Sequence, residues 1–253
     1  MIHVGHVREI VRYPIKSMAG IATESALLGW HGLDGDRRFT FRRMGENNGF
    51  PWLTASRLPE LLLYQPVGLD ESSGEPLPTH VRTPAGSHLE LRSAELNVEI
   101  GERFRSEVEL MHLKHGIFDE AAVSVISLAT IAGIGREAAV GIDLDRRRFR
   151  ANIVLETERS EPFLEDAWVG GMLTFGDSDA TGYEGPALSV TMRDVRCVMV
   201  NLDPETAEKD ARVMKTVVRL NQNNAGVYGT VVRTGRVRVG DRVSLVAETA
   251  TTT

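Results

Sequence analysis

Short apolar segments separated by turn residues are the feature of this sequence that most constrains its fold. Phe39 and Phe41 lie two residues apart, the period of a half-buried strand. Many short strands with few helices favour barrel-like sheets, because closing a sheet removes edges that would otherwise pair with other chains. We therefore predict a mostly β (α+β) fold with short helices and with strands near residues 4–10, 37–43, 88–91, 96–100, 123–126, 149–155, 188–200, 226–233 and 237–246.

Two segments are predicted to form helices. Ser127 is suited to cap a short helix that runs to about Val140. The better helical pattern covers 204–220, with Pro204 in the first turn and Asp203 as its N-cap. Residues 59–63 are read as one helical turn or the start of a strand, and 29–35 and 70–78 as turns rich in glycine, proline and polar residues.

The pattern changes near residues 105–120, where short strands and turns give way to longer apolar segments. A length of 253 residues suits one large domain or two small ones. We expect two domains, residues 1–110 and 111–247, followed by a disordered tail at 248–253.

Charge and cysteine content exclude several classes of protein. Lysine and arginine total 29 against 35 aspartates and glutamates, a net charge of −6, which argues against nucleic acid as a partner. No apolar run approaches the roughly 18 residues of a membrane span, and no signal peptide opens the chain. One cysteine excludes an intrachain disulfide and an iron–sulfur cluster held by this chain alone. We expect a cytoplasmic protein that does not bind membranes.

The single cysteine, Cys197, has two interpretations. A lone cysteine on an apolar strand is usually a small buried hydrophobe. Arg193 and Arg196 support the other interpretation, because nearby cations favour the thiolate, the form that ligates transition metals or attacks substrates. The residues alone leave both open.

Basic residues recur beside the predicted strands. Each by itself is explained as a surface charge, but together they would form an anion pocket, because Lys and Arg with hydroxyl donors bind phosphate well. His112 and His115 lack an evident third ligand and are interpreted as surface histidines. The basic residues in question are Lys16, Arg37, Arg38, Arg57, Arg146, Arg147, Arg148 and Arg150.

Several segments resemble the motifs of one family, in that family's order. Tyr-Pro-Ile-Lys-Ser at 13–17, Gly-Asp-Arg-Arg-Phe at 35–39 and Leu-Thr-Ala at 53–55 resemble the N-terminal β-barrel domain that precedes MOSC domains. The second half resembles the MOSC domain, the C-terminal domain of molybdenum cofactor sulfurases. The matching stretches there are 149–154, 165–168, 196–197, 203–206, 226–228 and 237–241.

This resemblance implies two packed β-barrel-like domains with molybdenum cofactor (molybdopterin) bound between them. It implies that Cys197 ligates the molybdenum and is the catalytic residue. Ala151 and Ser56-Arg57 depart from the family's pattern, where relatives carry proline and Arg-Gln. The cofactor-binding role falls by resemblance on Lys16, Ser17, Arg37, Thr54, Arg57, Arg150, Asn152 and Arg196.

The sequence is similar to the amidoxime-reducing components, which implies a reductase of small N-hydroxylated compounds acting by oxygen-atom transfer. Asn201 and Asp203 could orient substrate or relay protons, although Asp203 is better explained as a helix cap. The chain shows no dinucleotide fingerprint and holds neither an iron–sulfur cluster nor pyridoxal phosphate, so a separate flavin or iron–sulfur reductase would supply electrons. Two alternatives remain: a sulfur carrier using a Cys197 persulfide, and a non-catalytic cofactor carrier.

Overall fold

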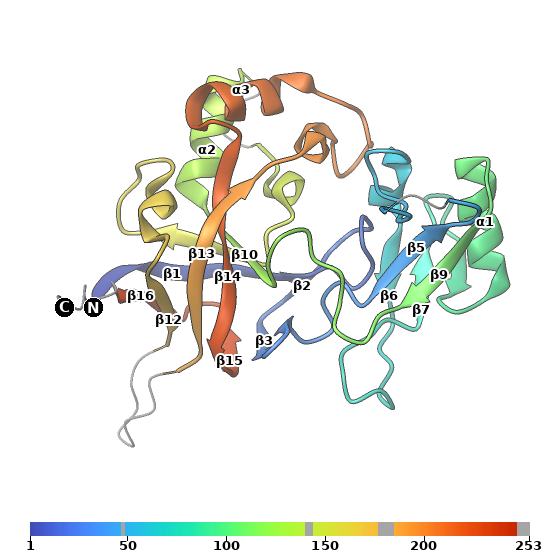
Figure 1. Ribbon diagram of the computed structural model, residues 1–253, viewed down its shortest axis with the longest axis horizontal. Helices are drawn as coiled ribbons and strands as arrows, with labels where there is room; N and C mark the ends of the chain where they lie inside the picture. The colour runs from blue at the N-terminus through green and yellow to red at the C-terminus, as the bar shows by residue number, and fades with distance from the viewer. Residues whose placement is uncertain (47–48, 140–143, 177–184, 247–253) are drawn as a thin grey trace.

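Seven strands close into a barrel in the computed structural model, which describes residues 1–46, 49–139, 144–176 and 185–246. The barrel lies on the left in Figure 1, and all its neighbouring strands are antiparallel except β10 (Val123–Ser127) and β11 (Ile153–Thr157). The prediction of a mostly β fold with short helices is therefore confirmed. In order around the barrel the strands are β1 (Ile2–Arg12), β11 (Ile153–Thr157), β10 (Val123–Ser127), β14 (Asn224–Arg233), β13 (Ala187–Val195), β12 (Met172–Phe175) and β16 (Arg242–Val246), which pairs again with β1.

The core of the barrel combines the start of the chain with its second half. Val7 and Ile10 of β1 are buried in the same cluster as Val227 and Val243. The short strands that follow β1 join this unit through β2 (Ile21–Thr23), which pairs with β1, and β3 (Ser25–Gly29), which pairs with β4 (Gly32–Leu33) and β15 (Gly235–Arg238). The first strands of the chain thus pack with its second half, and the division into domains at residue 110 stays a prediction.

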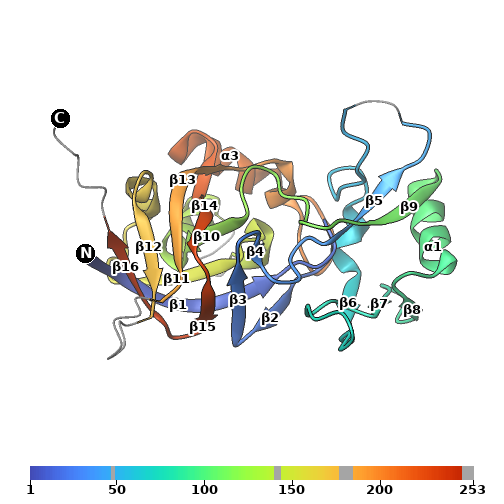
Figure 2. The ribbon, with the colours of Figure 1, turned by 60° about the horizontal axis from the view of Figure 1, so that its bottom comes forward.

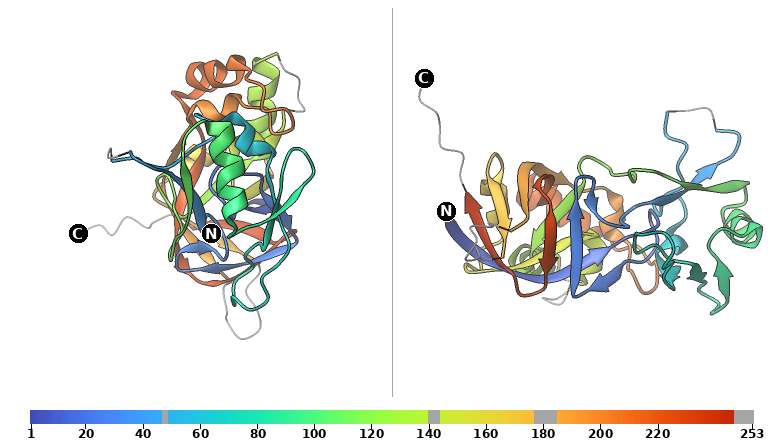
Figure 3. Two further views of the ribbon diagram at one scale, coloured as in Figure 1. Left: turned by 90° about the vertical axis from the view of Figure 1, so that its right-hand side faces the viewer. Right: turned by 90° about the horizontal axis from the view of Figure 1, so that it is seen from below.

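A second apolar core lies in a smaller unit beside the barrel, at the far end of the molecule from the N-terminus (Figures 2 and 3). Its buried side chains include Phe39, Phe41, Leu61 and Ile100. The elements around it are β5 (Phe39–Arg43), which pairs with β9 (Val108–His112), the sheet of β6 (Gln65–Val67), β7 (His80–Arg82) and β8 (His88–Glu90), and helix α1 (Ala94–Phe104).

Helices α2 (Leu128–Glu137) and α3 (Ala211–Asn221) pack together over one side of the barrel. Ser127 caps α2, because its hydroxyl accepts a hydrogen bond from the Thr130 amide at 3.1 Å, as predicted. The helix ends at Glu137, and Val140 lies outside the described residues, as does the tail from 247. No helix in the described ranges is long and apolar enough to cross a membrane.

The predicted strand at 96–100 is wrong, because this segment lies within α1. Leu96 and Ile100 are both fully buried and lie four residues apart, the spacing of one helix face. The Ser93 hydroxyl accepts a hydrogen bond from the Leu96 amide and caps the helix. The helical spacing and the cap were both present in the sequence.

The predicted helix start at Pro204 is also wrong, because α3 begins at Ala211. Residues 204–206 form a turn in which Oδ1 of Asp203 accepts hydrogen bonds from the amides of Glu205 and Thr206. Asp203 therefore stabilises a turn, and the side chain of Asp210 caps the helix instead.

Two further segments end differently from the sequence prediction. Residues 146–149 form a 3-10 helix before β11, and residues 198–201 form another after β13, so these strands are shorter than 149–155 and 188–200. Residues 59–63 form a 3-10 helix, which decides between the helical turn and the strand start. Arg150 therefore lies before β11, and Cys197 lies after β13, so neither residue is part of the sheet.

The carboxyl group of Glu165 is completely buried beside the N-terminus of α2. It accepts hydrogen bonds from the Ser127 amide at 3.2 Å and the Ser127 hydroxyl at 3.0 Å. Burial raises the pKa of Glu165 above its ordinary value, and the hydrogen bonds only partly offset this. The folded chain therefore holds the proton more tightly than the unfolded chain does.

The free energy of unfolding should decrease as pH rises from 4.5, the ordinary pKa of glutamate, through the raised pKa of Glu165 in the folded state, because the buried carboxyl group then loses its proton. We expect Glu165→Gln, whose amide can serve the same two partners, to remove this loss. Urea unfolding at about pH 5 and about pH 8 measures the effect. The free energy of unfolding of the variant, relative to that of the wild type, should be higher at the higher pH. The exposed Glu161→Gln is the control, and an equal pH slope for Glu165→Gln and the wild type would contradict the prediction.

Candidate functional site

A cavity of about 350 Å³ lies where the barrel meets the smaller unit. Seven of the nine predicted site residues line it: Lys16, Ser17, Arg37, Thr54, Arg150, Arg196 and Cys197. The smaller unit contributes Lys16, Ser17, Arg37 and Thr54, and the barrel side contributes Arg150, Arg196 and Cys197. Segments far apart in the sequence therefore form one cleft. The sequence analysis did not select Asp119, Ser124, Arg148, Asp194 or Tyr228 as site residues, although they also line the cleft.

Cys197 is exposed at this cleft. It follows the end of β13 and starts the 3-10 helix Val198–Asn201, so it is not on a buried strand. The interpretation of Cys197 as a small buried hydrophobe is therefore wrong. An accessible thiol beside a polar cleft is available to ligate a metal or to react.

Arg196 is held rigidly behind Cys197. Its Nε donates to the carbonyl of Ala225 at 2.7 Å, and Nη1 donates to the carbonyl of Phe149 at 2.6 Å. Nη2 forms an ion pair with Asp194 at 2.8 Å but is buried without a hydrogen-bond partner among the described residues. Burial raises the pKa of Asp194, and Arg196 opposes that shift.

Gly226 makes room for this arginine. Its φ of +85° lies in the left-handed region, and a Cβ there would stand 2.6 Å from the Val125 carbonyl oxygen and 3.1 Å from Nη2 of Arg196. A larger residue would push the guanidinium out of place. Glycine at 226 is thus required by the close approach of the arginine and the backbone of β10.

Arg37 connects the beginning of the chain to the second half. It forms an ion pair with the buried Asp36, and it donates to Oδ1 of Asn152 and to the carbonyl of Arg150, both at 3.2 Å. Burial works against the charged guanidinium, but the Asp36 carboxylate outweighs it and holds the pKa of Arg37 above its ordinary value. Asn152 does not line the cleft, so it acts by positioning Arg37.

Arg150 is the cation with the least compensation in the cleft. Its guanidinium lies over the ring of Tyr13, 4.2 Å from the centroid, and no carboxylate of the described residues bonds to it. Burial lowers the pKa of Arg150 to about 10. A buried cation without a counter-charge gains most from a bound anion.

Lys16 is paired with a carboxylate that can be displaced. Its Nζ lies 2.6 Å from Oδ1 of Asp119, whose side chain is 64% exposed while that of Lys16 is 9% exposed. Burial acts to raise the pKa of Asp119, but the charge of Lys16 outweighs it and holds that pKa below its ordinary value. Because Asp119 can turn to solvent, Lys16 is available to a competing anion.

Three residues of the cleft have left-handed backbone conformations: Ser17, Arg37 and Arg150, with φ of 70°, 48° and 51°. Such conformations cost on the order of 1–3 kcal/mol for residues other than glycine and tend to persist at functional sites. They aim three of the predicted ligand-binding side chains at one space. This strain supports a binding function for the cleft.

Other candidate residues lie elsewhere. Arg57 is exposed and does not line the cleft, where Ser56 and Thr54 lie instead with their hydroxyls 2.7 Å apart. Oδ1 of the buried Asn201 accepts from the Met214 amide, and Asp203 pairs with Arg148 at 2.6 Å. Neither lines the cleft, and His112 and His115 are exposed away from it.

Among the missed residues, only some gave a sequence signal. Arg148 lies in the basic run 146–150, and Tyr228 closes the Gly-Val-Tyr segment at 226–228. Asp119 and Ser124 gave no signal, because they bond to Lys16 and Asp194 across long stretches of chain. Asp194 was not selected, although it pairs with Arg196 two residues further on.

The donor set fits a ligand with a phosphate group and a thiolate-bound metal. Lys16, Arg37 and Arg150 supply positive charge, and Cys197 supplies a soft ligand. Nη2 of Arg196 and Nε of Arg148 are buried without hydrogen-bond partners in the described part of the chain. The fold and cleft therefore define a barrel protein with a cleft at the junction of two units that is lined by cations and one thiol.

The chain belongs to the MOSC domain family. Residues 112–244 match the MOSC domain, and residues 4–122 match the MOSC N-terminal beta barrel domain. This family includes the C-terminal domains of molybdenum cofactor sulfurases and is associated with binding of that cofactor. The resemblance drawn from the short sequence motifs is confirmed at this level.

Several solved structures are similar to the chain, and the YuaD protein shares its fold. The YuaD protein from Bacillus subtilis is 14% identical, with a TM-score of 0.53 and coverage of 97% of both chains. YiiM from Escherichia coli is 15% identical over 54% of this chain and 59% of its own, with a TM-score of 0.37. A search of curated proteins found no match.

Proposed function

We propose that this protein binds molybdenum cofactor in the cleft and reduces N-hydroxylated compounds. The observation that carries the proposal is the exposed thiol of Cys197 at a cleft lined by cations from both units. A thiolate suits the metal of a molybdopterin, and a cluster of cations suits its phosphate. Membership of the MOSC family supports the same cofactor.

The bound cofactor would supply two-electron oxygen-atom transfer chemistry. An N-hydroxylated amidine would take up two electrons and two protons, lose the oxygen of its N–OH bond as water and leave as the amidine. The residues of this chain would bind and orient: Cys197 as the metal ligand, and Lys16, Ser17, Arg37 and Arg150 around the phosphate and pterin. Thr54 and Arg196 would complete the binding site.

The electrons require a second protein in this proposal. One cysteine cannot hold an iron–sulfur cluster, which normally takes four ligands. We propose that a separate flavin or iron–sulfur reductase docks transiently near the cleft. The surface around the thiol includes the exposed side chains of Val195 and Val198, which are available for such a contact.

Cofactor-loaded protein should reduce benzamidoxime when given a viologen-type donor or an added reductase, and it should be inactive with NADH alone. The assay measures the formation of benzamidine from benzamidoxime by chromatography, and the molybdenum content is measured on the same sample. Turnover with NADH and no second protein would contradict the need for a reductase. Loaded protein that is inactive with every strong donor would contradict the reductase function.

The exposure of Cys197 also favours a second function, sulfur transfer. An accessible thiolate can receive a sulfur atom as a persulfide from a separate sulfur donor and pass it to a metallocofactor. Incubation with a cysteine desulfurase and cysteine, followed by mass spectrometry, would show a gain of one sulfur at Cys197. A persulfide together with absent reductase activity would favour sulfur transfer, and cofactor binding with neither activity would favour a carrier.

Lys16→Ala should weaken cofactor binding while leaving the fold stable. Loss of one charge-assisted hydrogen bond to phosphate should cost about 1.5–3 kcal/mol, or roughly tenfold to a hundredfold in Kd. Stability should change little, because the partner Asp119 is exposed and can be hydrated. The measurement is pterin and molybdenum retained after gel filtration, with the exposed Lys114→Ala as control. Equal retention by Lys16→Ala and the wild type would exclude Lys16 from the phosphate site.

A further inference from the structure

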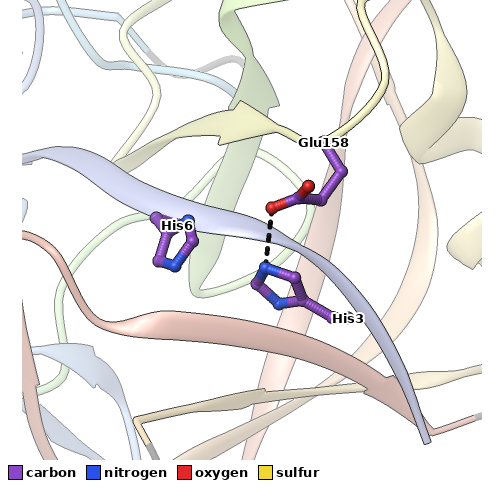
Figure 4. A group of neighbouring side chains, drawn as sticks. All are labelled: His3, His6 and Glu158. Atoms are coloured by element: carbon purple, nitrogen blue, oxygen red, sulfur yellow. Dashed lines mark hydrogen bonds and ion pairs between the residues drawn. The ribbon is translucent and has the colours of Figure 1, made fainter.

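Two histidines and a glutamate gather near the start of the chain (Figure 4), and none of the three lines the cleft. His3 and His6 lie on β1, and Glu158 directly follows β11. One ligand atom of each side chain lies within 4.8 Å of those of the other two. The two imidazole rings meet edge to face, with centroids 4.9 Å apart.

An irregularity in β1 brings the two histidines together. Residues three apart on a regular strand face opposite sides of the sheet. The register between β1 and β16 shifts between His3 and Gly5, and Gly5 has a φ of +153°. A Cβ at Gly5 would stand 2.1 Å from the Glu156 carbonyl oxygen, so only glycine allows this close approach. The bulge at Gly5 thus places His3 and His6 on the same side.

The hydrogen bonds of His3 suit a metal ligand. Its Nδ1 lies 3.2 Å from the carbonyl oxygen of Val243, and its Nε2 lies 2.8 Å from Oε1 of Glu158. When Nδ1 donates to the carbonyl, the Nε2 of neutral imidazole presents a lone pair to the carboxylate. Two acceptors at this distance need a proton or a metal cation between them. Donation of the second ring nitrogen to a backbone carbonyl is typical of metal-bound histidines.

The charges around the cluster come from both neighbouring strands. Arg242 is the β16 partner of His6, and its Nε donates a hydrogen bond to Nδ1 of His3 at 3.2 Å, which competes with donation from Nδ1 to the Val243 carbonyl. Glu156 is the β11 partner of His6 and adds negative charge on the other side. Arg242 is exposed and can turn away, so its positive charge weakens cation binding without blocking it.

We propose that His3, His6 and Glu158 bind a zinc ion, with water in the remaining position. Zinc takes imidazole nitrogen and carboxylate oxygen at about 2.0–2.2 Å, so ligand atoms on one tetrahedral ion lie roughly 3.3–3.5 Å apart. The present separations reach this arrangement by side-chain rotations, because His6 and Glu158 are exposed. The ion would join β1 to the end of β11, the pairing that closes the barrel.

Zinc titration of the untagged full-length chain against a chromophoric chelator tests this site. We expect one zinc per chain in the wild type and in Cys197→Ser, which removes the exposed thiol as a competing ligand. His3→Gln, His6→Gln and Glu158→Gln should each weaken binding by at least about tenfold. His88→Gln, an exposed histidine on β8, should bind as the wild type does, and Arg242→Gln should bind equally or more tightly.

Three results of the same titration would contradict the proposed zinc site. Absence of stoichiometric zinc in the wild type would do so, as would binding that survives His3→Gln and His6→Gln or disappears in Cys197→Ser. Cobalt substitution gives an independent readout, since its visible absorption should be lost in His6→Gln. Zinc should also raise the Tm of the wild type but not that of His6→Gln.

Discussion

Cys197→Ser should lose its molybdenum while keeping the fold. The thiolate would be the protein's soft ligand to the metal, and a serine hydroxyl is a poor substitute for it. Because Cys197 is exposed, the substitution should change the free energy of unfolding by no more than about 0.5 kcal/mol. Metal analysis of protein from a host that makes the cofactor should find molybdenum at background, and substrate reduction should be absent.

Val198→Ala is the matched control for this experiment, because Val198 is also exposed and is the next residue in the chain. It should retain molybdenum at the wild-type level. Pterin analysis of Cys197→Ser separates loss of the metal bond from loss of the whole cofactor, since the cations of the cleft are unchanged. Stoichiometric molybdenum in Cys197→Ser would show that this thiol is not a ligand.

Arg37→Ala should both destabilise the protein and reduce cofactor binding. The side chain of Asp36 is fully buried, and removing Arg37 leaves its charge without a counter-ion, with only the Tyr13 amide still donating to Oδ1. Breaking a buried ion pair from one side typically costs about 3–5 kcal/mol. The hydrogen bonds of Arg37 to Asn152 and to the Arg150 carbonyl, which connect the two halves of the chain, would be lost as well.

The neighbouring arginine provides the control. Arg38 pairs with Glu75, whose side chain is 34% exposed, and donates to the Leu113 carbonyl, so Arg38→Ala should cost less, about 1–2 kcal/mol. Urea unfolding of both variants measures the difference. Arg37→Lys should recover part of the stability, because it keeps a charge beside Asp36. An unfolding midpoint for Arg37→Ala equal to that of Arg38→Ala would contradict the role given to this ion pair.

The sequence predicted the cleft residues better than it predicted the elements that position them. Lys16, Arg37 and Cys197 lie in short motifs whose order along the chain identified the family, so their gathering in one cleft could be expected. Arg57 belongs to a segment that departs from the family's pattern, and its side chain lies outside the cleft. Asn152 lies one residue from a second departure, and it acts through Arg37.

Local patterns determined the class of fold, because alternation along a strand and turn residues act over a few positions. They did not decide between strand and helix at 96–100, where a buried face of two residues fits either until the rest of the core is present. They also misplaced the start of α3, because Asp203 and Asp210 both suit an N-cap. Asp210 forms the cap, because a helix that starts there packs its apolar side chains Val213 and Val217 into the core beside the barrel.

The sequence by itself determined a mostly β chain, the order of its family motifs and the supply of cations and one thiol for a site. Only the tertiary structure decided that β1 closes the barrel against β11, that Cys197 is exposed, and that His3 and His6 meet Glu158. The physical reason is the same in each case. Exposure and pairing depend on contacts between residues far apart in the chain, and no local pattern encodes the distances between them.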